Sequence, residues 1–293
     1  MRGRMQAMLI AVVFIFLSLP LPPLNIISAA AVALVTLRQG QRAGLITIFG
    51  AGAALGILGQ ILFDNAGLAI TYALLFWLPV WILSVLLRES GQLALTFEAA
   101  LGLGVLGIVG IYLFNSDPAS IWQEKLQSFV SPMMKNTPPG IEIEQIETLI
   151  KLGSHYMTGA IAAGSLVSFI SAILIGRWWQ AMLFNPGGFR KEFLSLKPHA
   201  IVAYVILFVF VLVGFGSGLI SESMWNVGIL GFFFYLIVGI AVLHVLISAT
   251  SASRFLLPVM YIVLLFIPHL LLPVALLGFS DTWANWRGRI AAK

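Results

Sequence analysis

The sequence predicts an all-α membrane protein, a bundle of eight or nine transmembrane helices with amphipathic helices in one long extracytoplasmic loop. The 293-residue chain is 60% hydrophobic, and 9% of its residues are charged, against roughly 25% in a soluble domain. Hydrophobic runs of about 20 residues, the length that crosses a bilayer, recur along the chain. A soluble fold could not bury this much apolar surface, so we expect a lipid bilayer to surround the protein.

The distribution of charge excludes several classes of function. The formal net charge is +5, but the basic residues lie in short loops between hydrophobic runs, where they set the orientation of helices. We therefore expect no nucleic-acid partner. The chain has no cysteine, which excludes disulfides and thiolate metal sites. We recognise no Ser/His/Asp set, zinc motif or carboxylate cluster, so we expect no metal, no cofactor and no enzymatic activity.

The first three predicted helices surround a basic elbow. Residues 6–19 form the first and end at a proline-rich turn; they resemble a signal peptide but lack a small-x-small cleavage site. Residues 25–37 are too few to span upright, so this second segment is thinned, extended through the prolines, or re-entrant. Residues 43–62 form the third. The elbow at 38–42 holds two arginines and a glycine, which places it and the N-terminus on the cytoplasmic side.

The middle of the chain alternates spans with one long polar loop. Residues 67–87 and 93–114 are the next two predicted spans. The loop at 115–153 then carries five acidic and three basic residues, which fits the outer side of the membrane. Apolar residues recur there at helical spacing, starting after Asp117 and Pro118, a typical helix start. We expect amphipathic helices that lie on the membrane surface or against the bundle.

The last third of the chain gives an inconsistent topology. We predict spans at 155–175, 199–220, 227–249 and 255–277, with a basic cytoplasmic loop before the second of them. This order leaves the basic tail outside the cell, against the positive-inside rule. Either one segment does not span, or the tail lies at the outer interface.

Short motifs near both ends of the chain resemble a known family. The elbow has the pattern Arg-x-Gly-x-Arg-x-Gly over residues 38–44, and residues 277–281 read Leu-Gly-Phe-Ser-Asp, followed by Arg287. Together with the order of helices, these motifs resemble the YybS-like family of uncharacterised bacterial membrane proteins. That family is similar to the S-components of energy-coupling-factor transporters over its first six helices.

The resemblance implies a division of the chain and a set of partners. Residues 1–177 would form an S-component-like unit that binds a small solute near the outer face, and residues 178–293 would add a cytoplasmic loop, two or three further helices and a tail. S-components dock on a transmembrane coupling subunit, which works with an ATPase, through an Ala-x-x-x-Ala pattern. Ala7 and Ala11 match this pattern, although an Ala-rich chain also contains such spacing by chance. The additional helices depart from an ordinary S-component.

Polar residues at the expected outer ends of the first six helices are candidates for binding the solute. They surround the aromatic residues Phe63 and Trp122, and the loop at 115–153 would cover them as a lid. Pockets with apolar walls and a few polar groups are typical of small-molecule sites. In the alternative interpretation, residues 64–65 are an ordinary turn and the loop lies on lipid. The candidates are Asn25, Asp64, Asn65, Asn115 and His155.

Ionisable residues inside predicted spans are a second set of candidates, because they are costly in a bilayer. Glu98, His244 and His269 could share a proton or cation pathway. Alternatively, Glu98 snorkels to the inner interface and pairs with Arg42 or Arg254, while the histidines bond backbone carbonyls that nearby prolines free.

A glycine-containing loop at 185–192 carries Arg190 and Lys191. It could hold phosphate, but no Gly-Lys-Ser/Thr follows, so contact with lipid headgroups is favoured. Taken together, the sequence predicts a multi-pass protein of the bacterial cytoplasmic membrane that binds or transports a small solute without an ATPase of its own. The alternative is a membrane scaffold that recruits proteins or lipids.

Overall fold

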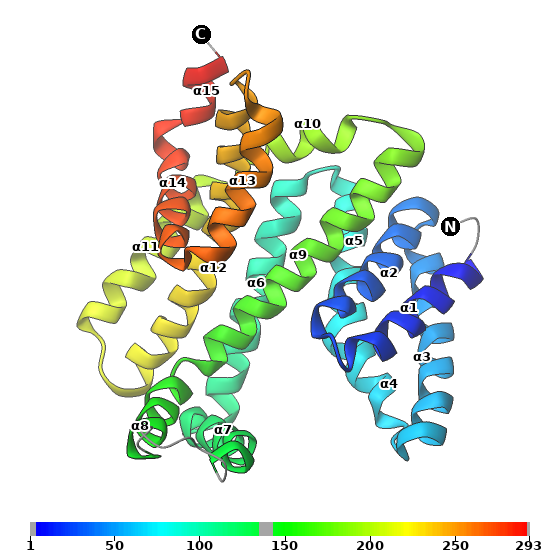
Figure 1. Cartoon of the computed structure of the whole chain (residues 1–293), viewed down its shortest axis with the longest axis vertical. Helices are drawn as coiled ribbons and strands as arrows, with labels where there is room; N and C mark the ends of the chain where they lie inside the picture. Colours follow the sequence, from blue (N-terminus) through cyan, green and yellow to red (C-terminus); the bar gives the residue numbers. More distant parts are fainter. Residues whose placement is uncertain (1–3, 135–142, 292–293) are drawn as a thin grey trace.

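The computed structural model describes residues 4–134 and 143–291, and every regular element in those residues is helical (Figure 1). The predicted all-α class is therefore confirmed. The elements are α1 Arg4–Ser18, η1 Pro22–Leu24, α2 Asn25–Gln39, α3 Gln41–Phe63, α4 Gly67–Tyr72, η2 Ala73–Trp77, α5 Leu78–Ser90, α6 Leu93–Phe114, α7 Pro118–Met134, α8 Ile143–Ser154, α9 Met157–Phe184, α10 Gly188–Leu194, α11 Ala200–Phe215, α12 Gly218–Ser248, α13 Ser253–Phe266, η3 Pro268–Leu270, α14 Leu271–Ala284 and α15 Trp286–Ala291.

Five helices in the described residues are long and apolar enough to cross a membrane. They are α3, the continuous α4–η2–α5 segment, α6, α9 and α12, and the bent pair α13–α14 would raise the count to six. The predicted count of eight or nine spans is not confirmed. Helix α1 has 15 residues, or about 23 Å at 1.5 Å per residue, which is shorter than the roughly 30 Å hydrocarbon core. Helices α2 and α11 are similarly short, with 15 and 16 residues.

Helix α2 is the centre of the N-terminal half. Its residues from Ser28 to Leu37 are all buried, so it is an enclosed short helix and not a lipid-facing span. The Ser28 hydroxyl donates to the carbonyl of Ala11 at 2.8 Å and accepts the indole N–H of Trp77 at 2.9 Å. A Cβ on Gly176 of α9 would lie 2.8 Å from the Cβ of Ala33, so small residues allow these two helices to touch.

In the basic elbow at 38–42, a single residue, Gly40, lies outside the two helices. Gly40 has φ of +94°, a conformation that glycine adopts without the steric cost a Cβ brings, and it separates α2 from α3. Arg88 at the end of α5 donates to the carbonyl of Leu37, so it caps the C-terminal end of α2. The predicted turn between the second and third segments is therefore confirmed, and two helices that run in opposite directions meet there.

The predicted span at 255–277 is not one continuous helix. The chain bends by 110° between α13 and the η3–α14 segment, because Pro268 has no N–H to continue the helix and its ring disfavours a helical preceding residue. Helix α14 therefore returns to the end from which α13 came. There Arg287 Nη1 donates to the carbonyl of Leu194 at 3.1 Å, and Lys197 Nζ lies 3.4 Å from Asn285 Oδ1. The basic tail thus lies beside the basic loop, which removes the conflict in the predicted topology.

Two other predicted boundaries differ from the structure. Helix α9 continues nine residues past the predicted end at 175, and it crosses the bundle obliquely between the N-terminal and C-terminal helices (Figure 1). The predicted domain boundary at 177 lies inside this helix. Helix α12 begins at Gly218, nine residues before the predicted start, so a stretch interpreted as a loop is helical. This longer α12 brings two polar side chains, Glu222 and Asn226, into the bundle.

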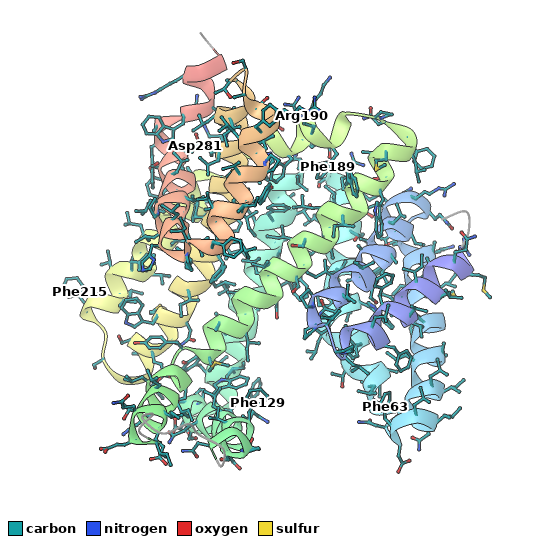
Figure 2. All side chains as sticks on the ribbon, in the orientation of Figure 1. Phe63, Phe129, Phe189, Arg190, Phe215 and Asp281 are labelled. Carbon is teal, nitrogen blue, oxygen red and sulfur yellow. The ribbon has the colours of Figure 1, made fainter. Side chains whose placement is uncertain are left out.

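The two ends of the bundle differ in character. In Figure 1, α10 and α15 lie at the upper end, and α7 and α8 lie at the lower end. Figure 2 places Arg190 at the upper end, and Phe63 and Phe129 at the lower end. Helices α7 and α8 are the predicted amphipathic helices of the long loop, of which residues 135–142 lie outside the described part. Phe129 is 68% exposed at this end, as expected for a helix that lies against lipid.

Candidate functional site

A cleft of about 390 Å³ lies between the α4–η2–α5 segment, α6 and the first half of α9. Its volume falls in the range of roughly 300–1,000 Å³ that is typical of small-molecule pockets. The π-helix η2 forms one wall, and π-helical turns inside α-helices occur frequently at functional sites. The lining residues are Leu74, Leu75, Phe76, Pro79, Leu103, Gly104, Gly107, Ile108, Ile111, Thr158, Ile161, Ala162, Ser165 and Phe169.

Two hydroxyl groups are the polar features of this lining. Trp122 of α7 donates its indole N–H to Thr158 Oγ1 at 2.8 Å, which fixes the amphipathic helix at one end of the cleft. In contrast, the Ser165 hydroxyl makes no hydrogen bond with any described residue. Ser168, one turn further along α9, does bond the carbonyl of Gly164 at 2.8 Å. Ser165 therefore offers an unused donor and acceptor to whatever occupies the cleft.

A polar network lies directly beside the cleft. The Tyr112 hydroxyl donates to Glu222 Oε1 at 2.6 Å, and His155 Nδ1 lies 2.6 Å from Glu222 Oε2. The Glu222 side chain is 15% exposed, so most of this carboxylate is removed from water and its two partners stabilise it. Since Tyr112 belongs to α6, His155 precedes α9 and Glu222 belongs to α12, the network ties three helices together at the same end as α7 and α8.

Asn226 completes the network one turn along α12 from Glu222. It is fully buried, and its amide nitrogen lies 2.7 Å from the carbonyl oxygen of His155, 2.8 Å from that of Glu222 and 3.0 Å from the Tyr112 hydroxyl. Its oxygen accepts the backbone N–H of Gly159 at 2.5 Å. That N–H is in the first turn of α9, where no intrahelical acceptor exists, so Asn226 caps α9 from a different helix.

The predicted solute-binding residues make separate contacts, and a solute site that they share stays a prediction. No hydrogen bond in the described structure joins any two of them. His155 belongs to the polar network, whereas the Asn115 side chain bonds the carbonyl of Ile111 in its own helix. Asp64 Oδ1 accepts from Gln60, and the backbone of Asn65 bonds Gly59, so this pair closes the end of α3. Two further residues singled out in the sequence have contacts of their own. Asn25 is the first residue of α2, and the ring of Phe63 stacks on that of Phe16.

The three ionisable candidates have separate surroundings. Glu98 accepts the backbone N–H of His199 at 2.6 Å, and both of its oxygens lie 2.9 Å from His199 Nδ1. The predicted pairing with Arg42 or Arg254 is therefore wrong. His244 Nε2 lies 2.9 Å from the Tyr261 hydroxyl, and His269 lies exposed in η3 at the bend between α13 and α14. No hydrogen bond in the described residues links the three, and a shared pathway stays a prediction.

The predicted contact residues are mostly engaged within the chain. Ala7 and Ala11 are fully buried: Ala7 packs beside Val35, and the Ala11 carbonyl accepts the Ser28 hydroxyl. They are therefore not accessible to a docking partner in this structure. Arg190 Nη2 donates to Ser248 Oγ at 3.1 Å, and Arg190 remains exposed at the upper end of the bundle (Figure 2). Its neighbour on α10, Lys191, is also exposed.

Sequence reasoning missed Tyr112, Glu222 and Asn226. Interpreting residues 221–226 as a loop hid the spacing of Glu222 and Asn226, which are four residues apart and share one helix face. A carboxylate and an amide at this spacing next to a long apolar run would have indicated a buried polar site.

These features define the class: a polytopic, all-helical membrane protein with an apolar cleft and a buried polar network beside it. A family described as predicted membrane protein (DUF2232) matches residues 142–282 of this chain, a little under half of its length. The matched segment includes His155, Glu222 and Asn226. Neither the curated proteins nor the solved structures include a match to the chain.

Proposed function

We propose that this protein binds a small, neutral, predominantly apolar solute in the cleft between η2, α6 and α9. The observation that carries the proposal is the Ser165 hydroxyl, which has no partner among the described residues, whereas the other hydroxyl of the lining, that of Thr158, already bonds Trp122. Among the described residues, no charged side chain lines the cleft, so an ion would lose its hydration without gaining a counter-charge. A neutral molecule with one hydroxyl, carbonyl or amide group would satisfy Ser165 and bury its apolar remainder.

The arrangement of helices at the end with α7 and α8 supports entry of the solute from outside the cell. The basic residues of the elbow, of α10 and of the tail would be cytoplasmic by the positive-inside rule, which leaves α7 and α8 outside. In this orientation the N-terminus lies on the cytoplasmic side of a bacterial cytoplasmic membrane. Trp122 then ties α7 to Thr158, a residue that lines the cleft, and we propose that α7 acts there as a lid. The S-component-like interpretation likewise expects a solute site near the outer face.

Transport and partners are a further step of the same proposal. The chain is proposed to act without an ATPase and without enzymatic activity, so an ion gradient or a coupling subunit with its ATPase would supply any energy. Because Ala7 and Ala11 are buried, a coupling subunit would have to dock on a different surface. The alternative function, a scaffold, would recruit proteins or lipids through the cytoplasmic loops and the outer segment at 115–153, and would leave the cleft to lipid.

Mass spectrometry of the purified protein distinguishes these functions. A bound solute other than lipid or detergent is expected in the wild type. Gly107→Leu adds a side chain in the cleft, where a Cβ meets no atom within 4 Å, so the solute is expected to be lost while the fold is kept. Gly164→Leu is the matched control, because that glycine is on an exposed face of α9 and also has no neighbour within 4 Å.

Ser165→Ala tests the polar contact within the cleft. Losing one neutral hydrogen bond costs about 1 kcal/mol, so the affinity for the released and re-added solute should fall roughly fivefold. A wild-type protein that carries only lipid, or a solute that remains in Gly107→Leu, would overturn the proposal and favour the scaffold.

A further inference from the structure

A second groove, separate from the cleft, lies between α6, α11 and the start of α12. Its volume is about 510 Å³, and Glu98 is its one charged lining residue. Along α6 the groove extends from Glu98 to Val109, which is about 16 Å at 1.5 Å per residue. That length is about half of the roughly 30 Å hydrocarbon core, the depth of one leaflet. The other lining residues are Leu101, Gly102, Val105, Leu106, Ile201, Val202, Val205, Ile206, Val209, Met224 and Val227.

The carboxylate of Glu98 lies at the end of this groove that is nearer the basic end of the bundle, where α10 and α15 lie. Its side chain is 14% exposed, and it is held at the N-terminus of α11 by the backbone N–H and the ring of His199. The α11 dipole and the His199 N–H both stabilise its negative charge there. A carboxylate has about four lone-pair positions, so Glu98 can accept a further N–H from a molecule in the groove.

The surroundings of Glu98 mark the level of the lipid headgroups. Trp283 of α14 donates its indole N–H to the Tyr204 hydroxyl at 3.1 Å, and both rings are exposed. Paired, exposed Trp and Tyr residues are enriched where the membrane meets water. Lys197, two residues before His199, is also exposed, and its ammonium has only a 3.4 Å contact with Asn285 Oδ1. Glu98 therefore supplies a negative charge at one end of an apolar groove, and Lys197 lies two residues along the chain from the His199 that holds Glu98.

We propose that this groove binds an ethanolamine phospholipid of the cytoplasmic leaflet. One acyl chain would lie between α6 and α11, the primary ammonium would donate to Glu98, and the phosphate would contact Lys197. A choline headgroup carries a similar charge but has no N–H to donate, and a glycerol headgroup has no cation for Glu98. The carboxylate of Glu98 at the end of the groove thus favours an ethanolamine headgroup over both.

Native mass spectrometry of the full-length protein from equimolar mixtures of ethanolamine, choline and glycerol phospholipids tests this proposal. The ethanolamine lipid should be retained preferentially by the wild type. Glu98→Gln keeps the size of the side chain and removes the charge, so the preference should fall by roughly tenfold, the scale of a charge-assisted hydrogen bond. Lys197→Gln, at an exposed position that does not threaten folding, should lower retention of all three phospholipids.

Gly102→Leu tests the acyl-chain part of the groove. A Cβ on Gly102 meets no atom within 4 Å, so the leucine should fill the groove without disturbing the protein and should reduce retention of all lipids, whereas Gly164→Leu should not. Equal retention of the three phospholipids by the wild type, or an unchanged preference in Glu98→Gln, would overturn the proposal. So would a transmembrane peptide or a non-lipid solute bound in their place. Loss of the solute from the η2–α6–α9 cleft would have no bearing on this result.

Discussion

Asn226→Ala should be among the most destabilising substitutions in the part of the chain that the structure describes. The change leaves two groups without their partner, the N–H of the buried Gly159 and the carbonyl of the partly exposed His155. Each unsatisfied buried group costs about 1–3 kcal/mol. Because His155 is only partly buried, its carbonyl should contribute the smaller part of this cost. We therefore expect a loss of about 2–4 kcal/mol in the free energy of unfolding.

Thermal unfolding of the purified protein in detergent measures this effect. Ser168→Ala is the control, because it also removes one helical polar side chain but leaves only a carbonyl already bonded within α9. Its effect should remain within about 0.5 kcal/mol. If Asn226→Ala and Ser168→Ala melt at the same temperature, Asn226 does not hold the start of α9, and the description of the network as a structural tie is incorrect.

Three further outcomes follow from the C-terminal helices. Gly239→Leu should sharply reduce the yield of folded protein, because a Cβ there would collide with the backbone carbonyl of Val274 where α12 crosses α14; size-exclusion chromatography of detergent extracts measures it. Arg287→Met should cost about 3–5 kcal/mol by leaving the buried carboxylate of Asp281 unpaired, and the added change Asp281→Asn should recover much of that loss in a thermal melt. Reporter fusions after Lys293 and Arg190 should give the same cytoplasmic signal, and a fusion within 125–140 the opposite one; different signals from the first two would contradict the re-entrant α13–α14 pair.

The sequence predicted those parts of the fold that depend on local pattern. The predicted span at 93–114 coincides with α6, and the amphipathic pattern after Asp117 corresponds to α7. The bend at Pro268 was not predicted, although the proline that causes it was visible, because the surrounding residues form one continuous apolar run. Hydropathy measures how favourably a segment lies in lipid, and it does not show whether the segment spans the bilayer.

The candidate site was less predictable because its parts come from distant segments. Glu222 lies 110 residues from Tyr112 in the sequence, and only the packing of α12 against α6 and α9 makes them partners. The polar residues at 221–226 favoured a loop, because burying a carboxylate without hydrogen-bond donors is costly. The donors to Glu222 could not be identified from the sequence. His155 was identified, but the residues expected beside it, such as Asp64, belong to a different helix end.

The enclosed position of α2 has a consequence for biogenesis. In the folded protein, Ala33 of α2 packs against Gly176 of α9. Gly176 is synthesised 137 residues after Gln39, the last residue of α2. At roughly 5–20 residues per second, the ribosome needs about 7–27 s to reach that point. During this interval Ala33 and Leu34 of α2 have no α9 beside them, so the nascent N-terminal helices must be sheltered by lipid or by the insertion machinery. Substitutions that make α2 less apolar should therefore act first on insertion yield, before any effect on the finished protein.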